Sequence, residues 1–278
     1  MSQYTYPEVL VDTQWLAEHL NNPNIRLVEV DVSPEVHNAA HIPGAVFWSL
    51  FTDLLQPNLQ INFDSSAMEK ILSNSGITPD TTIIAYGSYP GIGAWIFWLL
   101  NVFGHQNVRV LNGGYQKWKA EGYPVTAEYS DFTPTQYKIQ SLNNSLRAFK
   151  DDVRAFIGQK NSVLLDVRTA QEYQGEWFFD KPPEATETAG HIPSAVHIEH
   201  LQTFQEDGTF KSIDELQALY ERHGITANQN IITYCAIGGR SGCIWFVLKY
   251  LLGYQNVQNY DGSWNEWSQL PAQEFKKE

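Results

Sequence analysis

The chain has 278 residues, enough for one large domain or two ordinary ones, and 43% of them are hydrophobic, which favours packed cores over disorder. Its net charge of −13, with no basic run, argues against a nucleic-acid-binding surface. The two cysteines, Cys235 and Cys243, fall in one predicted element and are not a disulfide framework, which fits a reducing compartment. The N-terminal segment lacks a signal-peptide pattern, and the longest apolar run, Ile92 to Leu100, is too short to span a bilayer, so we expect a soluble, cytoplasmic protein with no membrane partner.

Residues 1–128 are expected to form an α/β domain with a mostly parallel sheet, because short apolar, β-branched runs alternate there with helical segments. One of these segments has an apolar stripe at helical spacing. Residues 129–144 are polar and without periodicity, and we interpret them as the linker to a second domain. The strand-like runs are 27–32 and 82–86, and the stripe is formed by Trp95, Trp98, Leu99 and Val102.

Residues 145–278 show the same alternation and are predicted to be a second α/β domain. Two apolar runs are predicted as buried strands and two longer segments as helices. The last helix carries an apolar stripe at positions i, i+3, i+4 and i+7, which would face the sheet. The strands are Val163–Val167 and Ile231–Tyr234, the helices are Ile213–His223 and Ser241–Leu252, and the stripe is Ile244, Val247, Leu248 and Leu251.

The two halves form an internal repeat, which helps to separate scaffold from chemistry. Several segments recur in order, among them Ala40–Val46 as Gly190–Val196 and Asn112–Trp118 as Asp261–Trp267. Features present in both halves are interpreted as structural. On this basis we assign the paired histidines to turns with satisfied hydrogen bonds, the paired aspartates to strand ends, and the paired tryptophans to packing. These pairs are His41 with His191, Asp31 with Asp166, and Trp118 with Trp267.

Cys235 does not belong to this shared pattern, because Gly87 stands at the equivalent position. It lies between the strand 231–234 and a helix, at the usual ligand crevice of an α/β sheet. The following loop brings glycines, one permanent positive charge and a helix N-terminus to the thiol, and all of these favour the thiolate. We therefore predict that Cys235 is a nucleophile and that Cys243, inside the helix, is a small buried hydrophobe.

The loop residues are predicted to hold the anion that forms at the sulfur. Glycines let the backbone N–H groups converge on one point, and Ser241 is predicted as the N-cap of the following helix. Four residues separate Cys235 from Arg240. A loop this tight suits a single sulfur atom better than a phosphoryl group, which favours sulfur transfer over phosphate-ester hydrolysis. The predicted substrate-binding residues are Ala236, Ile237, Gly238, Gly239, Arg240 and Ser241.

These features together closely resemble the two-domain form of the rhodanese family of sulfurtransferases, over essentially the whole chain. The resemblance rests on the repeated motifs, the Gly208–Phe210 segment and the short loop after Cys235. It implies two tandem rhodanese-like domains, of which the first is non-catalytic. It also implies a ping-pong reaction in which Cys235 takes sulfur as a persulfide, held by the amides from Ala236 to Ser241, and passes it to cyanide or another thiophilic acceptor. No metal or organic cofactor is implied.

The resemblance leaves the sulfur donor open. Animal-type members that use thiosulfate carry basic residues where this chain has Ile237 and Glu172, and the mercaptopyruvate type has a different loop. The arginine at the end of the loop, Arg240, is instead similar to that of bacterial two-domain members described as thiosulfate transferases. Thiosulfate is the first expectation, and 3-mercaptopyruvate, a protein persulfide or a small thiol compound are alternatives. A persulfide carrier or sensor for a protein partner is a second hypothesis, and a phosphatase is a third. Arg168, where the first half has Ser33, is interpreted as a structural ion-pair partner of Glu172.

Overall fold

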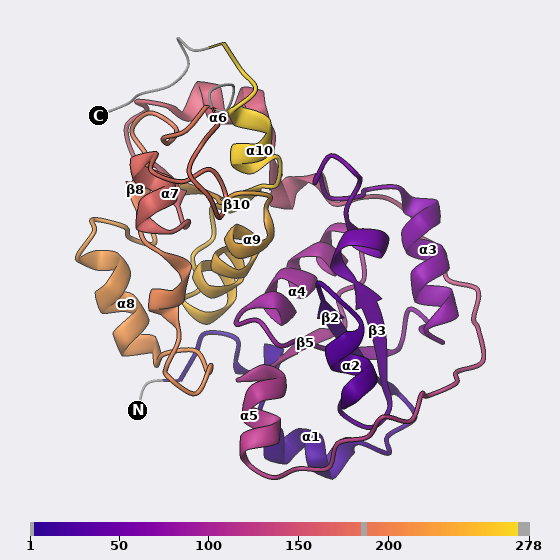
Figure 1. Ribbon diagram of the computed structural model, residues 1–278. Helices are drawn as coiled ribbons and strands as arrows, with labels where there is room; N and C mark the ends of the chain where they lie inside the picture. The colour runs from indigo at the N-terminus through magenta and orange to yellow at the C-terminus, as the bar shows by residue number, and fades with distance from the viewer. Residues whose placement is uncertain (1–2, 185–187, 272–278) are drawn as a thin grey trace. The chain divides into compact units, whose positions relative to one another are not determined.

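The computed structural model describes residues 3–184 and 188–271, which are drawn as coloured ribbons in Figure 1. Its contacts divide the chain into two units, and each unit takes in a short segment from the other half of the sequence. None of the helices in the described ranges is both long enough and apolar enough to cross a membrane. The N-terminal unit consists of Tyr6–Asn143 and Phe204–Lys211, and the C-terminal unit of the described residues before Tyr6, within 144–203 and within 212–271.

The sheet of the N-terminal unit has five parallel strands in the order β1-β5-β4-β2-β3. Parallel strands are covered on both faces, which explains why the strand 82–86 is apolar along nearly its whole length. Ile84 and Tyr86 point to one face of the sheet, and Ala85 between them points to the other. The strands are β1 Leu10–Val11, β2 Ile25–Asp31, β3 Ala45–Ser49, β4 Thr82–Tyr86 and β5 Val108–Leu111.

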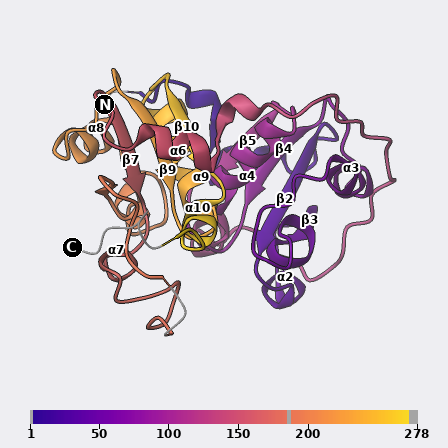
Figure 2. The ribbon, with the colours of Figure 1, turned by 90° about the horizontal axis from the view of Figure 1, so that it is seen from above.

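Helices cover both faces of this sheet (Figures 1 and 2). On one face, Leu16 of α1 and Trp118 of α5 pack with Ile84 in a buried cluster. On the other, Gly93 of α4 lies so close to the Ala85 carbonyl that a side chain would overlap it. The helices are α1 Thr13–His19, α2 Glu35–Ala39, α3 Ser65–Asn74, α4 Ile92–Val102 and α5 Gly114–Ala120, with a 3-10 turn η1 Pro7–Val9 and a π-helical turn η2 Leu50–Leu54.

The sheet of the C-terminal unit repeats this topology, with five parallel strands in the order β6-β10-β9-β7-β8. Strand for strand, the order is that of the N-terminal sheet. The prediction of two α/β units with mostly parallel sheets is therefore confirmed. The strands are β6 Arg147–Ala148, β7 Ser162–Asp166, β8 Val196–His197, β9 Asn230–Tyr234 and β10 Val257–Tyr260.

Helices also flank the C-terminal sheet on both faces. Val153 of α6 and Trp264 of α10 pack with Tyr234 on one face. Thr233 points to the opposite face, where its hydroxyl donates to the Ser241 carbonyl of α9 at 3.0 Å. The helices are α6 Lys150–Phe156, α7 Ala170–Gln174, α8 Ile213–Glu221, α9 Gly239–Phe246 and α10 Ser263–Trp267, with 3-10 turns η3 Asn144–Leu146 and η4 His200–Thr203.

The helix that follows the cysteine loop differs from its predicted form. It begins two residues before Ser241, and after Phe246 the chain passes into a π-helical turn, η5 Val247–Leu251. Every residue from Gly93 to Val102 of α4 is buried, as is every residue from Ser241 to Phe246 of α9. The predicted stripe facing the sheet was therefore too narrow, because both segments are apolar around most of their circumference.

The strand registers also correct the alignment of the repeat. Tyr86 of β4 lies opposite Glu29 of β2, and Tyr234 of β9 lies opposite Asp166 of β7. Both tyrosines directly precede the loop after the strand. Asp166 therefore corresponds to Glu29, and its pairing with Asp31 in the motif alignment was wrong by two residues.

Candidate active site

The candidate active site is the loop that joins β9 to α9 in the C-terminal unit. Cys235 follows the last residue of β9, so its side chain starts at the carboxyl end of a central strand. Gly238 has a φ of 90°, a left-handed conformation that a residue with a side chain adopts only at a cost, and it is the N-cap of α9. This turn places the first residues of the helix directly after the cysteine.

The Cys235 sulfur is buried and contacts two hydrogen-bond donors from the same loop. The Gly238 N–H lies 3.1 Å from Sγ, and the Ser241 hydroxyl lies 3.5 Å from it. The predicted N-cap role of Ser241 is wrong, since Ser241 lies inside α9 and the cap residue is Gly238, which has no side chain. Ser241 instead directs its hydroxyl at the sulfur. Both donors would stabilise negative charge on the sulfur.

The backbone of Cys235 is held by residues at the start of α10. The Cys235 N–H donates to the Ser263 hydroxyl at 3.1 Å, and the Trp264 N–H donates to the Cys235 carbonyl at 3.0 Å. The Ser263 hydroxyl in turn donates to the Tyr260 carbonyl at 2.8 Å. Ser263 has a φ of 51°, which is unfavourable for a residue that is not glycine.

The N-terminal unit shows what is special about Ser263. The Tyr115 N–H donates to the Gly87 carbonyl at 3.2 Å, so Tyr115 corresponds to Trp264 and Gly114 to Ser263. Gly114 has nearly the same φ, 56°, but offers no hydroxyl. The sequence reasoning missed Ser263, although the repeat aligned it with Gly114 and so contained the signal.

The far side of the loop is fixed by a buried amide. The Asn259 Nδ2 donates to the Gly238 carbonyl at 3.1 Å, and the Asn265 N–H donates to the Ala236 carbonyl at 2.9 Å. Asn259 and Gly238 are both buried. These bonds leave the loop little freedom to change shape.

Arg240 forms a bidentate ion pair with Glu172 of α7. Its two terminal nitrogens lie 2.7 and 2.8 Å from the two carboxylate oxygens. Glu172 is buried, and it also accepts from the N–H and the hydroxyl of Thr169, at 2.9 and 3.0 Å, as the capping box of α7. Burial alone would raise the pKa of Glu172, but Arg240 lowers it below its usual value, so the pair is ionised at neutral pH.

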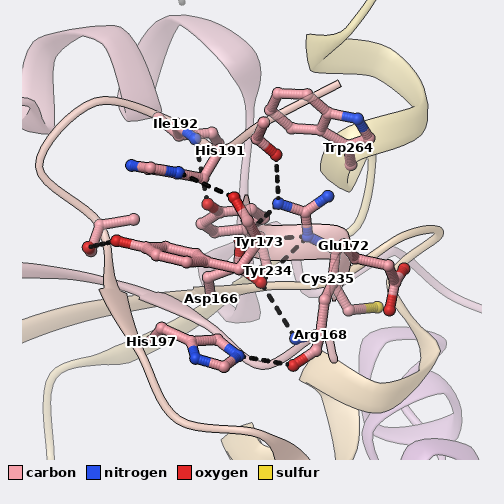
Figure 3. Close-up of polar contacts among 12 residues, drawn as sticks. Asp166, Arg168, Glu172, Tyr173, His191, Ile192, His197, Tyr234, Cys235 and Trp264 are labelled. Atoms are coloured by element: carbon pink, nitrogen blue, oxygen red, sulfur yellow. Dashed lines mark hydrogen bonds and ion pairs between the residues drawn. The ribbon is translucent and has the colours of Figure 1, made fainter. Parts of the chain in front are cut away.

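Arg168 is buried and pairs with Asp166, so the predicted pair with Glu172 is wrong. Its Nη2 lies 2.6 Å from Asp166 Oδ2 and donates to the Gly190 carbonyl at 2.7 Å. The guanidinium also lies over the Trp264 ring, at 4.6 Å from its centroid (Figure 3). Burial would lower the pKa of Arg168, but Asp166 raises it, which keeps the arginine charged. By the corrected register, Arg168 corresponds to Asp31 and not to Ser33.

The histidines near the site have partners other than the cysteine. His191 lies against the ring of Tyr173, with Nδ1 3.0 Å from the Tyr173 carbonyl, as a turn histidine would (Figure 3). His197 contacts the Arg168 carbonyl through Nε2 at 2.8 Å. Burial, and then the positive charge of Arg240, lower the pKa of His200 to about 3, so His200 is neutral at physiological pH.

Cys243 has the surroundings of a packing residue and not of a second nucleophile. Cys243 is buried in α9, and burial raises the pKa of its thiol, as expected for a packing residue. Within residues 3–184 and 188–271, no group of three or more histidine, cysteine, aspartate or glutamate side chains is arranged to hold a metal ion.

The loop of the N-terminal unit has no room for a side chain at Gly87, the position equivalent to Cys235. A Cβ at Gly87 would overlap the Val30 carbonyl oxygen and the Ile92 Cγ2 atom. The loop then reaches its own left-handed N-cap at Gly91, with a φ of 86°, one residue later than the cysteine loop does. The two loops therefore share a design, but the N-terminal one leaves no room for a side chain at the position that Cys235 occupies in the other.

The structure thus has two parallel-sheet units of the same topology, with a cysteine loop on one of them, which is the arrangement expected of the two-domain rhodanese form. A family model for the rhodanese-like domain matches residues 12–121 and 149–270, and the chain belongs to this family. "Sulfur carrier protein TtuD" of Thermus thermophilus is 43% identical over 273 residues, 96% of each chain. A protein of Mycolicibacterium smegmatis, provisionally named as a thiosulfate sulfurtransferase, is 41% identical over 266 residues, 95% of each chain.

Solved structures share the fold at lower identity. The anaerobic ergothioneine biosynthesis enzyme from Chlorobium limicola, in complex with trimethyl histidine, gives a TM-score of 0.85 at 25% identity, covering 98% of this chain and 71% of that one. The structure of YnjE gives a TM-score of 0.78 at 24% identity, covering 98% and 69%. These likenesses extend over both units of the chain.

Proposed function

We propose that this protein transfers a sulfane sulfur from thiosulfate, or a related donor, to cyanide or another thiophilic acceptor through a persulfide on Cys235. The observation that supports this most directly is the sulfur of Cys235, held at the carboxyl end of β9 with the Gly238 N–H 3.1 Å away. The loop directs the Gly238 N–H and the Ser241 hydroxyl at this sulfur, which would suit transfer of a single sulfur atom.

The reaction has two balanced steps. In the first, the Cys235 thiolate attacks the outer sulfur of thiosulfate, the sulfur–sulfur bond of the donor breaks, and sulfite leaves with the electron pair of that bond. In the second, cyanide attacks the outer sulfur of the Cys235 persulfide, thiocyanate forms, and the thiolate returns. Neither step needs an outside oxidant or reductant. A thiophilic protein acceptor would replace cyanide in the same second step.

The loop residues have distinct roles in this proposal. The amides from Ala236 to Ser241 would stabilise the persulfide anion, as donors to negative sulfur. Gly238 supplies the turn that aims them, and the Ser241 hydroxyl, 3.5 Å from Sγ, adds a donor. The Ile237 side chain is apolar and offers no positive charge that could bind an anionic donor.

The test is sulfur transfer by the purified protein and two cysteine variants. The wild type is expected to form thiocyanate from thiosulfate and cyanide, and to gain the mass of one sulfur atom after thiosulfate alone. Cys235→Ser should lose both properties. Cys243→Ala, which removes the buried packing cysteine, should keep them. Thiocyanate formation that persists in Cys235→Ser would refute the mechanism.

A second function, persulfide carriage for a protein partner, is favoured by the 43% identity to a protein named as a sulfur carrier. The same mass measurement separates the two. A cyanide-labile extra sulfur combined with very slow turnover of thiosulfate supports the carrier. A donor panel should include 3-mercaptopyruvate, which is the other small donor considered, and an aryl phosphate, whose Cys235-dependent hydrolysis would support a phosphatase.

A further inference from the structure

The segment from Cys235 to the end of α9 contains a single cationic residue, Arg240, and its positive charge is paired with the carboxylate of Glu172. Arg240 is the only lysine or arginine between Cys235 and the end of α9. Both of its terminal nitrogens contact the Glu172 carboxylate, at 2.7 and 2.8 Å. At these distances the pair acts on the loop as a dipole and not as a free positive charge.

Moving the Glu172 side chain away from Arg240 would cost free energy, because the carboxylate is buried and hydrogen-bonded. Its side chain is 2% exposed, and one of its oxygens accepts two further hydrogen bonds from Thr169. Releasing Arg240 toward a bound anion would leave a buried carboxylate without its counter-ion, which is strongly unfavourable. The arginine is therefore held in the pair while the donor binds.

The consequence concerns the charge of the sulfur donor. Backbone N–H groups and a helix N-terminus carry partial charges that suit a single negative charge. A dianion such as thiosulfate needs additional positive charge to replace its hydration, and the paired Arg240 does not supply it. The net charge of −13 adds no attraction at longer range.

We propose that Glu172 sets the charge preference of the site. By holding Arg240, it disfavours dianionic thiosulfate and favours sulfur donors with one negative charge at the transferred sulfur, such as persulfides and organic thiosulfonates. This inference rests on the proposed sulfur transfer through Cys235, and it names the donor class for that site.

The decisive variant is Glu172→Gln, because glutamine keeps the shape and can keep the capping box with Thr169 while removing the charge. The donors are thiosulfate, a dianion, and methanethiosulfonate, a monoanion that leaves as methanesulfinate. In the variant, the ratio of kcat/KM for thiosulfate to kcat/KM for methanethiosulfonate should rise about fivefold. This is the size expected when one negative charge is removed at a partly exposed site. The rise should shrink as salt is added.

The chain offers a matched control in α8. Glu215 closes a capping box with Ser212, accepting from its N–H at 2.9 Å and from its hydroxyl at 2.6 Å. Glu215→Gln therefore makes the same chemical change in the same helix position, away from the cysteine loop. It should leave the donor ratio unchanged. An equal loss with both donors in Glu172→Gln, without a change in their ratio, would mean that Glu172 is only structural, and the inference would be wrong.

A second measurement does not depend on sulfur transfer. The rates at which iodoacetate, an anion, and iodoacetamide, a neutral analogue, alkylate Cys235 can be compared by peptide mass. The ratio of iodoacetate to iodoacetamide rates should rise about fivefold in Glu172→Gln.

These two measurements separate the possible failures. If neither donor yields thiocyanate but the alkylation ratio shifts, the proposed function is wrong and the electrostatic role of Glu172 stands. If the alkylation ratio is the same in Glu172→Gln as in the wild type, the inference is wrong, whatever the outcome of the sulfur-transfer assay.

Discussion

At the scale of single residues, the site depends on a serine that occupies a glycine conformation. Ser263 keeps a φ of 51° where the N-terminal unit has Gly114 at 56°. A left-handed residue with a side chain costs about 1 kcal/mol, and such strain persists mainly where function requires it. The strained conformation places the Ser263 hydroxyl where it accepts a hydrogen bond from the Cys235 N–H at 3.1 Å.

Two variants of Ser263 should therefore separate activity from stability. Ser263→Gly relieves the strain and loses the hydrogen bond, whereas Ser263→Ala keeps the strain and also loses the bond. We expect sulfur transfer to fall about tenfold in both, because the cysteine is less well positioned. Thermal unfolding should show Ser263→Ala to be less stable than Ser263→Gly by about 1 kcal/mol.

The comparison between the variants is the test. A purely structural serine would make activity follow stability, so Ser263→Gly would keep nearly full activity while Ser263→Ala lost it. Alkylation of Cys235 by iodoacetamide gives a second readout, since it reports the state of the thiol without any sulfur donor.

Not all residues of the site were equally predictable. Cys235, Gly238 and Arg240 fall in one short segment, so residue type and spacing were enough to select them. The pairing of Arg240 with Glu172 joins positions 68 residues apart in the sequence. The sequence analysis paired Glu172 with Arg168, the arginine four positions before it, because a short spacing can be read from the sequence and a contact with a distant segment cannot.

At the scale of elements, the turn from β9 to α9 decides where the helix dipole is directed. The helix starts at Gly239 because Gly238 adopts a left-handed conformation, with a φ of 90°. The sequence alone favoured Ser241 as the cap, since serine is a common N-cap residue. The observed cap, Gly238, is selected for its left-handed backbone conformation and not for a side chain that accepts a hydrogen bond. The sequence alone does not show which of the adjacent glycines, Gly238 or Gly239, adopts that conformation.

The two glycines should respond differently to alanine. Gly238→Ala is expected to destabilise the protein by about 1–2 kcal/mol, because an L-residue is strained in the left-handed region. It should also lower sulfur transfer at least tenfold, since the N–H that contacts the sulfur would shift. Denaturant unfolding and thiocyanate formation measure the two effects.

Gly239→Ala is the matched control for stability. A Cβ at Gly239 would have no atom within 4 Å, and alanine favours the helix that begins there. Its free energy of unfolding should stay within about 0.5 kcal/mol of the wild type. Equal destabilisation by the two substitutions would show that the conformation of Gly238 is not what limits this turn.

At the scale of the whole molecule, the two units share one sheet topology but differ at the loop after the central strand, which carries Gly87 in one unit and Cys235 in the other. The repeated motifs predicted both sheets, because each strand–helix unit leaves its own local pattern of apolar residues. They did not predict that Phe204–Lys211 would join the N-terminal unit. That segment is held by Asp207, 2.8 Å from Lys117, and by the Phe210 N–H, which donates to the Asn112 side chain at 2.9 Å. Contacts between such distant positions have no local signature.

The N-terminal unit should resist conversion into a second catalytic domain by one substitution. Gly87→Cys supplies the missing thiol, but its Cβ would overlap the Val30 carbonyl and the Ile92 side chain. Overpacking of this kind costs about 1–3 kcal/mol. In a Cys235→Ser background, Gly87→Cys is expected to lower the thermal unfolding midpoint and to leave sulfur transfer at the background level.

The control is a thiol one residue further along the same loop. Ser88 already carries a Cβ, so Ser88→Cys meets no overlap with the backbone, although it loses the hydrogen bond from the Ser88 hydroxyl to Asp31. It should fold more stably than Gly87→Cys while also failing to take up sulfur. If Gly87→Cys proved as stable as its parent and gained a cyanide-labile sulfur, then the missing thiol alone would distinguish the N-terminal loop from the cysteine loop. We expect the opposite, because a side chain at Gly87 would overlap both the Val30 carbonyl of β2 and the Ile92 side chain.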